Sequence, residues 1–156
     1  MTAQLEPGDS LPSADHVLRY VRRKFVDSVL NQIDGNAFLS RPAEHGGPSF
    51  NWLEYFDGEA AERIEAIRRL RRLSYERRGR LARLNVGQTR EYLRDRAARP
   101  VDFIYDPLAE DAERNWLSDR SHAFLSNIPE IDTPEGEAIG DLIAHCVLES
   151  WPALAA

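Results

Sequence analysis

Residues 79–105, GRLARLNVGQTREYLRDRAARPVDFIY, combine the two kinds of element that decide the fold. From Leu81 to Val86 apolar and polar residues alternate, and such alternation predicts a half-exposed strand. Residues 88–98 contain no glycine or proline and end shortly before Pro100, so they predict a short helix. Residues 101–105 then predict a second strand, which gives a strand–helix–strand order along this part of the chain.

Two further helices are predicted outside this run. Residues 59–75 are free of proline and glycine, and their apolar residues fall on one half of a helical wheel while arginines gather on the other. Asp132 or Thr133 is placed to cap a C-terminal helix, with Pro134 at its first position. An apolar stripe at helical spacing extends this last helix as far as Trp151.

Other short apolar runs predict strands at residues 15–21, 37–39, 49–56 and 122–128. The run at 37–39 follows an Asp-Gly turn and predicts a hairpin with residues 26–33, which fit a strand or a helix. A short helix competes with the strand at 49–56. Because strands and helices do not alternate regularly, the sequence predicts an α+β fold. We expect a small mixed or mostly antiparallel sheet, packed in two layers against two to three helices.

The length of 156 residues fits one domain, which we place at residues 13–156. Residues 1–12 are polar and rich in turn formers, so we expect a disordered lead-in there and no secretory signal. No apolar run approaches the ~18 residues of a membrane span, which predicts no membrane association. The chain has a single cysteine, Cys146, and this suits a reducing compartment such as the cytoplasm.

Charge is distributed unevenly along the chain, although the formal net charge is only −6. Residues 63–99 hold thirteen arginines against four acidic residues, whereas residues 100–156 hold two arginines against twelve acidic residues. Lys24 is the only lysine among the 20 basic residues. Separation of this kind bears on association with other molecules and not on the fold.

The arginines of the predicted helix and the aromatic run at 49–56 are the candidate binding elements. Arginine and aromatic side chains dominate binding hot spots in protein interfaces. The predicted contact residues are Arg68, Arg69, Arg72, Arg77, Arg78, Trp52 and Tyr55. The competing interpretation is that the arginines pair with the chain's own carboxylates and that the aromatic run is core.

A nucleic-acid-binding protein is the alternative function, because arginines between Arg63 and Arg83 could neutralise a phosphate backbone. The isoelectric point near 5.3 and the acidic C-terminal third argue against it. A protein partner is therefore the first expectation and nucleic acid the second.

An enzyme is the second alternative, with His122 or the pair Arg19 and Ser49 in its site. His122 could act as a base, although no second histidine lies at metal-ligand spacing. Arg19, Ser49 and Glu54 loosely resemble the Arg, Ser, Glu order of ADP-ribosyl-transferring folds, and His16 could take the first position in the variant that begins with histidine. The residues predict no metal site, no cofactor and no phosphate-binding loop.

Four segments carry a resemblance: residues 51–56 (NWLEYF), 84–87 (LNVG), 119–123 (DRSHA) and 139–144 (IGDLIA). The chain resembles an uncharacterised family of small bacterial proteins. The resemblance implies a bacterial origin and transfers no functional residue. From the sequence we therefore expect a bacterial accessory protein that binds a protein partner within a multi-gene defence or toxin system.

Overall fold

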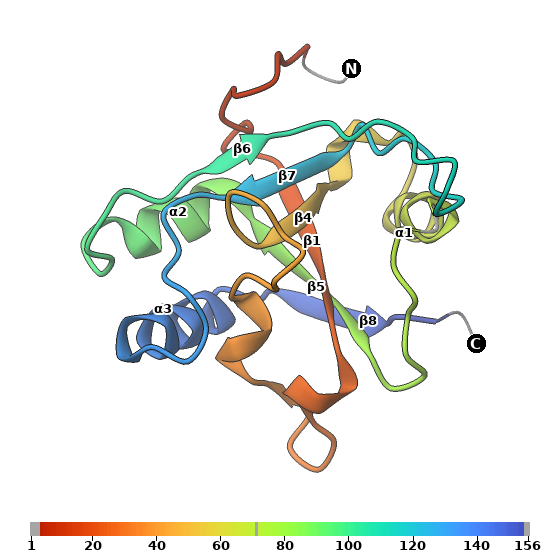
Figure 1. Ribbon diagram of the computed structural model, residues 1–156. Helices are drawn as coiled ribbons and strands as arrows, with labels where there is room; N and C mark the ends of the chain where they lie inside the picture. The colour runs from red at the N-terminus through yellow and green to blue at the C-terminus, as the bar shows by residue number, and fades with distance from the viewer. Residues whose placement is uncertain (1–3, 71, 155–156) are drawn as a thin grey trace.

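The computed structural model describes residues 4–70 and 72–154, and it confirms the α+β class (Figure 1). A six-stranded sheet has the order β6-β7-β4-β1-β5-β8, and a small hairpin joins β2 to β3. The strands are β1 (His16–Val21), β2 (Val26–Asp27), β3 (Gln32–Ile33), β4 (Ser49–Trp52), β5 (Arg80–Asn85), β6 (Phe103–Tyr105), β7 (His122–Leu125) and β8 (Glu149–Pro152). The α-helices are α1 (Ala60–Arg69), α2 (Val86–Arg94) and α3 (Pro134–His145). Short 3₁₀ helices are η1 (Arg23–Phe25), η2 (Gly35–Phe38) and η3 (Leu53–Tyr55).

The sheet is antiparallel at each of its pairings, and β1 lies near its middle between β4 and β5. Val17 faces Trp52 on one neighbour and Leu84 on the other, which fixes the register of the three strands. Since successive side chains of a strand point to opposite faces, this register also decides which residues each face presents.

The larger core lies on the face that carries Val17, Val21, Phe50 and Trp52. Helices α2 and α3 and the 3₁₀ helix η2 cover this face, to the left of the sheet in Figure 1. Asn85 caps α2 by accepting a hydrogen bond from Gln88 N, so β5 passes directly into the helix.

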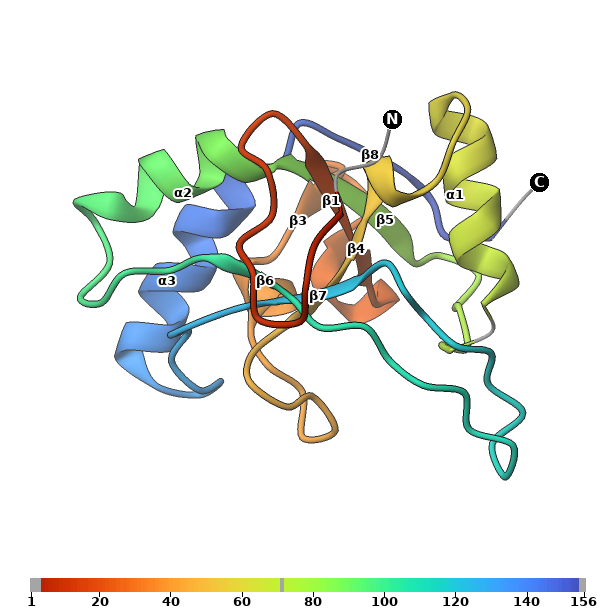
Figure 2. The same ribbon diagram turned by 90° about the horizontal axis from the view of Figure 1, so that it is seen from above.

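A second, smaller core lies on the opposite face of β1 and β5. It contains Leu18, Tyr20 and Leu81 from the sheet and Ile64 and Ile67 from α1. Figure 2 shows α1 on the other side of the sheet from α2 and α3. The helices therefore cover both faces, and the α1 face is the less completely covered of the two.

The predicted helix at residues 59–75 is wrong at its C-terminal end, because α1 ends at Arg69. Leu73 is exposed instead of buried on the predicted apolar half. Farther on, Tyr75 packs edge-to-face on Tyr20, and Glu76 N donates to the Tyr20 hydroxyl. These contacts bring the chain back to β1 in an extended form and replace further helical turns.

The predicted helix reaching Trp151 is also too long, since α3 ends at His145 and residues 149–152 form β8. This strand pairs with β5, with Leu81 opposite Trp151. The open edge of β5 offers backbone hydrogen bonds that the apolar stripe alone does not reveal. Residues 37–39 likewise fall in and next to η2 instead of a strand, because Gly35 lets η2 approach the backbone of Gly140 in α3 too closely for any side chain.

The N-terminal segment differs from the expected disordered lead-in at residues 8–11. Gly8 N and Leu11 N donate to carbonyl oxygens of β6, and Tyr105 N donates to Asp9 O. Leu11 is 1 % exposed because its side chain fills the larger core. Backbone hydrogen bonds to β6 and the packing of Leu5 and Leu11 on the larger core together dock the segment on the sheet. Within the described ranges, the structure contains no helix with the length and apolar character needed to cross a bilayer.

Candidate functional site

Ser49 and His122 meet on the α1 face of the sheet, where β4 pairs with β7. The Ser49 Oγ to His122 Nε2 distance is 2.9 Å. Ser49 is the first residue of β4 and His122 the first residue of β7, and the antiparallel register brings these two strand ends together. The sequence analysis offers His122 and Ser49 as alternative catalytic residues, and the structure brings the two into contact.

The other ring nitrogen of His122 determines what Nε2 can do. Nδ1 lies 2.7 Å from the main-chain oxygen of Asp106, and a carbonyl oxygen can only accept. Nδ1 therefore carries a proton, so in the neutral ring Nε2 accepts the hydrogen bond from the Ser49 hydroxyl. The Asp106 carboxylate lies 3.3 Å from Nδ1, close enough to stabilise a protonated ring. Serine, histidine and aspartate are thus arranged as in a hydrolytic triad, with a carbonyl oxygen as the nearest partner of Nδ1.

The ion pair between Arg19 and Glu44 binds both main-chain polar groups of Ser49. Glu44 Oε2 accepts from Ser49 N at 2.7 Å, and Arg19 Nη1 donates to Ser49 O at 2.9 Å. Arg19 and Glu44 also bind each other, with Nη1 2.8 Å from Oε2. Arg19 is 2 % exposed, and its remaining groups donate to Ala37 O and Leu39 O. Both backbone polar groups of the candidate nucleophile are therefore fixed by the same pair.

The pKa of Glu44 reflects this environment. Burial by itself raises the pKa of the carboxyl group, but the positive charge of Arg19 and the hydrogen bonds from Arg19, Arg41 N and Ser49 N outweigh burial. The net pKa lies below its ordinary value, so Glu44 is a carboxylate at neutral pH. Arg19 is thus buried and positions Ser49, so of the two residues considered for the first position of the ADP-ribosyl-transferring order, His16 is the one that is partly exposed.

Ser49 and His122 line a cavity of about 530 Å³. Two loops form its walls, residues 41–48 and residues 106–116. The first loop needs Gly46 and Gly47, whose φ values are +83° and +155°, and a side chain on Gly47 would collide with the Leu125 carbonyl. The second loop leaves β6 and runs toward the end of α1, as Figure 2 shows.

Arg72 ties the second loop to the segment after α1. Its Nη1 donates to Ala109 O and to Leu117 O, both at 3.1 Å, and its guanidinium lies over the Trp116 ring. Arg114 also contacts the Trp116 ring and pairs with Asp111. The cavity wall is therefore braced by Arg114 and by Arg72, and the sequence predicts the second of these as a partner contact.

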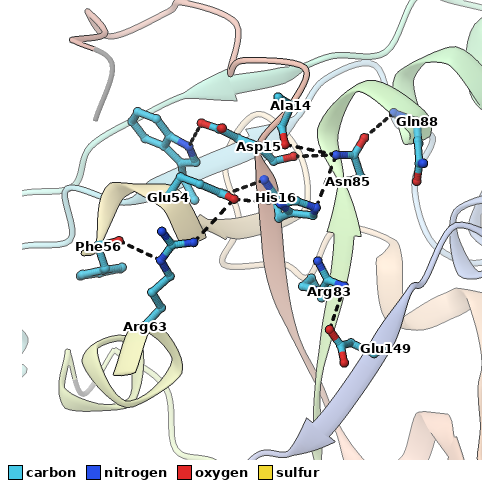
Figure 3. A network of polar contacts seen from close by, with 11 residues as sticks. Ala14, Asp15, His16, Glu54, Phe56, Arg63, Arg83, Asn85, Gln88 and Glu149 are labelled. Atoms are coloured by element: carbon cyan, nitrogen blue, oxygen red, sulfur yellow. Dashed lines mark hydrogen bonds and ion pairs between the residues drawn. The ribbon is translucent and has the colours of Figure 1, made fainter. Parts of the chain in front are cut away.

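His16 forms a second histidine cluster on the same face, at the beginning of β1 (Figure 3). The Glu54 carboxylate binds two groups of His16: Oε1 accepts from His16 N at 2.6 Å, and Oε2 lies 2.8 Å from Nδ1. Arg63 of α1 approaches the same carboxylate at 3.7 Å and donates through Nε to Phe56 O. Asn85 Nδ2 lies 3.5 Å from His16 Nε2.

The arginines predicted as a contact surface divide into two groups. Arg68 donates to Ala153 O and Pro152 O and pairs with Glu65, and Arg72 braces the cavity loop. Arg69, Arg77 and Arg78 are exposed, the last two in the turn before β5. Of these five arginines, Arg68 pairs with a carboxylate of the chain as the competing interpretation expects, whereas Arg72 binds main-chain oxygens.

The aromatic run is largely interior, which differs from the predicted contact role of Trp52. Trp52 is 1 % exposed, and its Nε1 donates to the Asp15 carboxylate. Tyr55 is half-buried and packs against Trp52 and Phe56. The strand ends at Trp52 and the chain turns into η3, so the strand and the short helix predicted as alternatives for residues 49–56 both occur.

Metal and thiol chemistry find little support in the described part of the chain. Among those residues no three of His, Cys, Asp or Glu gather as a metal site would require. Burial raises the pKa of the Cys146 thiol above its ordinary value, so it is a poor nucleophile at neutral pH.

Comparisons with known proteins identify no relative of this chain: no family model matches it, no curated protein matches it and no solved structure matches it.

Sequence reasoning misses Asp106 and Glu44, the residues that support His122 and Ser49. Asp106 appears in the sequence only as a strand terminator, and Glu44 as one polar residue of a loop. Glu44 lies between Arg41 and the glycines of the loop, and this position alone does not indicate a role in a site. Only the fold of the loop brings its carboxylate to Ser49. His16 and Glu54 are 38 residues apart and meet through the β1–β4 pairing.

Proposed function

We propose that this protein is a small serine enzyme that transfers or hydrolyses an acyl group, with Ser49 as nucleophile and His122 as general base. The observation that carries the proposal is the 2.9 Å contact between Ser49 Oγ and His122 Nε2 at the wall of the 530 Å³ cavity. Such a nucleophile–base pair, with a third group orienting the base, is the signature of nucleophilic catalysis by serine.

The chemistry follows from the hydrogen bonding of the two side chains. Ser49 Oγ attacks the acyl carbon while its proton passes to His122 Nε2, and the Asp106 oxygens stabilise the positive ring. Collapse of the tetrahedral intermediate breaks the bond to the leaving group, which takes the proton from Nε2. Water or another acceptor then attacks the acyl-Ser49 ester and gives its proton to His122 Nε2. Collapse of this second intermediate breaks the bond from the acyl carbon to Ser49 Oγ, which takes the proton back from Nε2, so the acyl product leaves and both side chains return to their starting state.

The buried pair behind Ser49 supports the same proposal. A nucleophile must be held close to its productive geometry, and Arg19 and Glu44 fix both backbone polar groups of Ser49. Glu44 itself contributes to the cavity wall beside Ser49, while the Arg19 side chain lies in the interior, so the pair holds Ser49 at the edge of the space in which a substrate would bind.

Labelling with a fluorophosphonate probe tests the proposal without knowledge of the substrate. The probe forms a covalent bond to an activated serine, and mass spectrometry of the digested protein locates it. We expect one label on the Ser49 peptide, lost in Ser49→Ala and reduced roughly 10²–10⁴-fold in rate in His122→Ala.

A matched control is His145→Ala, since His145 is exposed and stacks on Tyr92 far from the cavity lining. Its labelling rate is expected to equal that of the unchanged protein. Labelling that is absent in the folded protein, or that persists in Ser49→Ala at the same rate, would reject the enzyme.

A second candidate function is docking to a protein partner through Arg69, Arg77 and Arg78. The observation that favours it is the exposure of these three arginines in a chain of net charge −6. The sequence leads us to expect an accessory protein of a multi-gene bacterial defence or toxin system. Such a protein would use this basic surface to bind an acidic partner.

Charge reversal tests the docking surface. The triple change of Arg69, Arg77 and Arg78 to Glu should abolish co-purification of a partner from the native host, while Arg94→Glu on α2 should leave it unchanged. Partner recovery that survives the triple change would reject this surface. A salt-dependent affinity for nucleic acid that the same change removes would instead favour the nucleic-acid-binding alternative.

A further inference from the structure

The tip of the β2–β3 hairpin presents two aliphatic side chains to solvent. Val29 is 90 % exposed and Leu30 is 62 % exposed, the two highest values among the large apolar side chains that the structure describes. Single exposed apolar residues are common on protein surfaces, but two neighbours at the end of a projecting loop are typical of a surface that meets an apolar phase. Figure 1 shows this loop in orange, beyond the lower end of the sheet.

Hydrogen bonds fix the shape of the tip. Asp27 Oδ1 accepts from Val29 N at 2.9 Å and from Leu30 N at 3.0 Å. Asn31 follows with a φ of +53°, a left-handed conformation that asparagine tolerates well. Because the turn satisfies its own amides, the two aliphatic side chains are held outward in a defined position.

The base of the hairpin is anchored on the protein core. Phe25, Val26 and Ile33 are partly buried against the larger core, and Val26 pairs with Ile33 across the hairpin. Asp34 N donates to Phe25 O at 2.7 Å. The hairpin is therefore a fixed projection, and the exposure of its tip is a feature of the folded state.

Five exposed basic residues lie at the end of the sheet from which the hairpin projects: Arg22, Arg23, Lys24, Arg77 and Arg78. The first three lead directly into β2. The other two belong to the turn before β5, and the pairing of Val21 with Arg80 brings that turn to the same end. None of the five pairs with a carboxylate within residues 4–70 and 72–154.

Acidic residues are fewer at this end. Residues 22–34 and 76–79 contain the five basic residues and three acidic ones, Asp27, Asp34 and Glu76. Asp27 and Asp34 accept hydrogen bonds from main-chain amides of their own turns. This end of the molecule is therefore net positive, although the whole chain has a net charge of −6.

We propose that the β2–β3 hairpin binds the surface of an anionic lipid bilayer, with Val29 and Leu30 among the upper acyl chains and the basic residues at the lipid phosphates. A bilayer surface is anionic at its headgroups and apolar directly beneath them, and this order matches an apolar tip with cations behind it. The hairpin contacts one leaflet and needs no spanning segment. In this respect the proposal departs from the sequence-based expectation of no membrane association.

The shape of the hairpin favours a bilayer over a protein partner. The tip is convex, and the basic residues lie behind it in two separate segments, 22–24 and 77–78. A protein would need a pocket for both aliphatic side chains, with carboxylates placed around it to match. A lipid surface supplies an apolar layer and negative charge at every point and can open around the tip.

Sedimentation of the full chain with lipid vesicles tests the proposal. One set of vesicles is phosphatidylcholine alone, and the other contains equal amounts of phosphatidylcholine and phosphatidylglycerol. We expect binding to the anionic vesicles and much weaker binding to the neutral ones. The double change Val29→Ser and Leu30→Ser should lower the partition coefficient about tenfold or more, because the burial of two apolar side chains is lost.

Leu117→Ser is the matched control for the tip, since Leu117 is 53 % exposed and lies in the segment between β6 and β7. Its partition coefficient should equal that of the unchanged protein. All four altered side chains of these variants and of the charge variants below are exposed, and circular dichroism checks that each variant folds.

Charge reversal tests the basic residues. The double change Arg23→Glu and Lys24→Glu should lower binding to anionic vesicles roughly 30-fold, because each basic residue near such a surface contributes about tenfold or somewhat less. Arg94→Glu with Arg99→Glu changes the net charge by the same amount, at α2 and just after it, and should have little effect.

Absence of binding to anionic vesicles, or binding that the tip and charge variants both retain, would overturn the proposal. If the unchanged protein ignores vesicles while the same variants lose a protein partner from the native host, the hairpin docks to protein and the bilayer proposal fails. Fluorophosphonate labelling of Ser49 needs no vesicles, so failure of this surface and failure of the proposed enzyme remain distinguishable.

Discussion

His122 and His16 project from the same face of one sheet, and each has an oxygen partner at Nδ1. They differ in what meets Nε2: a serine hydroxyl at 2.9 Å for His122, and an amide nitrogen at 3.5 Å for His16. The first arrangement suits proton transfer from a hydroxyl, and the second offers His16 no hydroxyl from which a proton could be taken. The two imidazoles thus differ in chemistry because different atoms meet their Nε2 nitrogens.

The supports behind the two histidines differ as well. Ser49 is held by the Arg19–Glu44 pair in the interior, where solvent does not weaken the interaction. His16 is held by Glu54, whose side chain is partly open to solvent and lies near Arg63. A rigid support is expected where chemistry needs fixed geometry, and the interior pair behind Ser49 supplies one.

The largest expected difference concerns the two imidazoles themselves. His122→Gln should slow labelling of Ser49 by roughly 10²–10⁴-fold, because no base then takes the hydroxyl proton. His16→Gln should leave the labelling rate unchanged. Rate constants measured at several probe concentrations compare the two variants directly, and equal effects would remove the distinction between the sites.

The second difference concerns the carboxylates behind each site. Glu44→Gln should lower the free energy of unfolding by about 3–5 kcal/mol, because the change leaves the buried Arg19 without its partner charge. Glu54→Gln should cost at most about 1 kcal/mol, since its contacts are partly solvated. Urea unfolding of both variants measures the two values. A loss for Glu54→Gln as large as that for Glu44→Gln would show that the outer cluster is equally rigid.

A third expectation concerns acid stability. The pKa of Glu44 is lower in the folded state than its ordinary value of 4.5, so the unfolded chain takes up the proton first. The stabilisation from Glu44 is fully present above about pH 4.5 and is lost as the pH falls through the lowered pKa. Stability measured between pH 6 and pH 3 should therefore fall less steeply in Glu44→Gln than in the unchanged protein. Parallel curves would mean that another carboxylate dominates this range.

The smallest expected effect sharpens the role of Asp106. Its main-chain oxygen already orients His122 at 2.7 Å, whereas its carboxylate is 3.3 Å away and 43 % exposed. Asp106→Asn should therefore reduce Ser49 labelling by at most about fivefold, in line with the ~1 kcal/mol upper value of exposed ion pairs. A reduction as large as that of His122→Gln would assign the orienting role to the carboxylate.

Much of the fold follows from local pattern. Alternation in residues 80–85 and the Thr133–Pro134 start of α3 are local signals, and the structure confirms both elements. The end of α1 and the strand β8 could not be predicted in this way. Tyr75 turns toward Tyr20, and Trp151 pairs opposite Leu81, so partners distant in sequence decide these segments.

The candidate site is less predictable than the fold for the same reason. His122, Ser49, Arg19 and His16 can each be chosen from the sequence as chemically capable residues, but their grouping cannot. The register of β4 against β7 joins Ser49 to His122, and the pairing of β1 with β4 joins His16 to Glu54. The arginine-rich segment illustrates the converse, because Arg68 and Arg72 have carbonyl partners 37 or more residues away.

The strand order also has a consequence for how quickly the native state can form. In the six-stranded sheet β6 with β7 and β1 with β4 are pairs of successive strands, whereas β4–β7, β1–β5 and β5–β8 join strands that are distant along the chain. The central strand β1 forms its longest antiparallel pairing with β5, which begins more than 60 residues after the start of β1. Closing such long loops costs entropy before any contact repays it, so we expect refolding on the millisecond-to-second scale of non-local β proteins. Until β5 arrives, β1 exposes apolar side chains on both faces, and this interval is when the chain is most prone to aggregate.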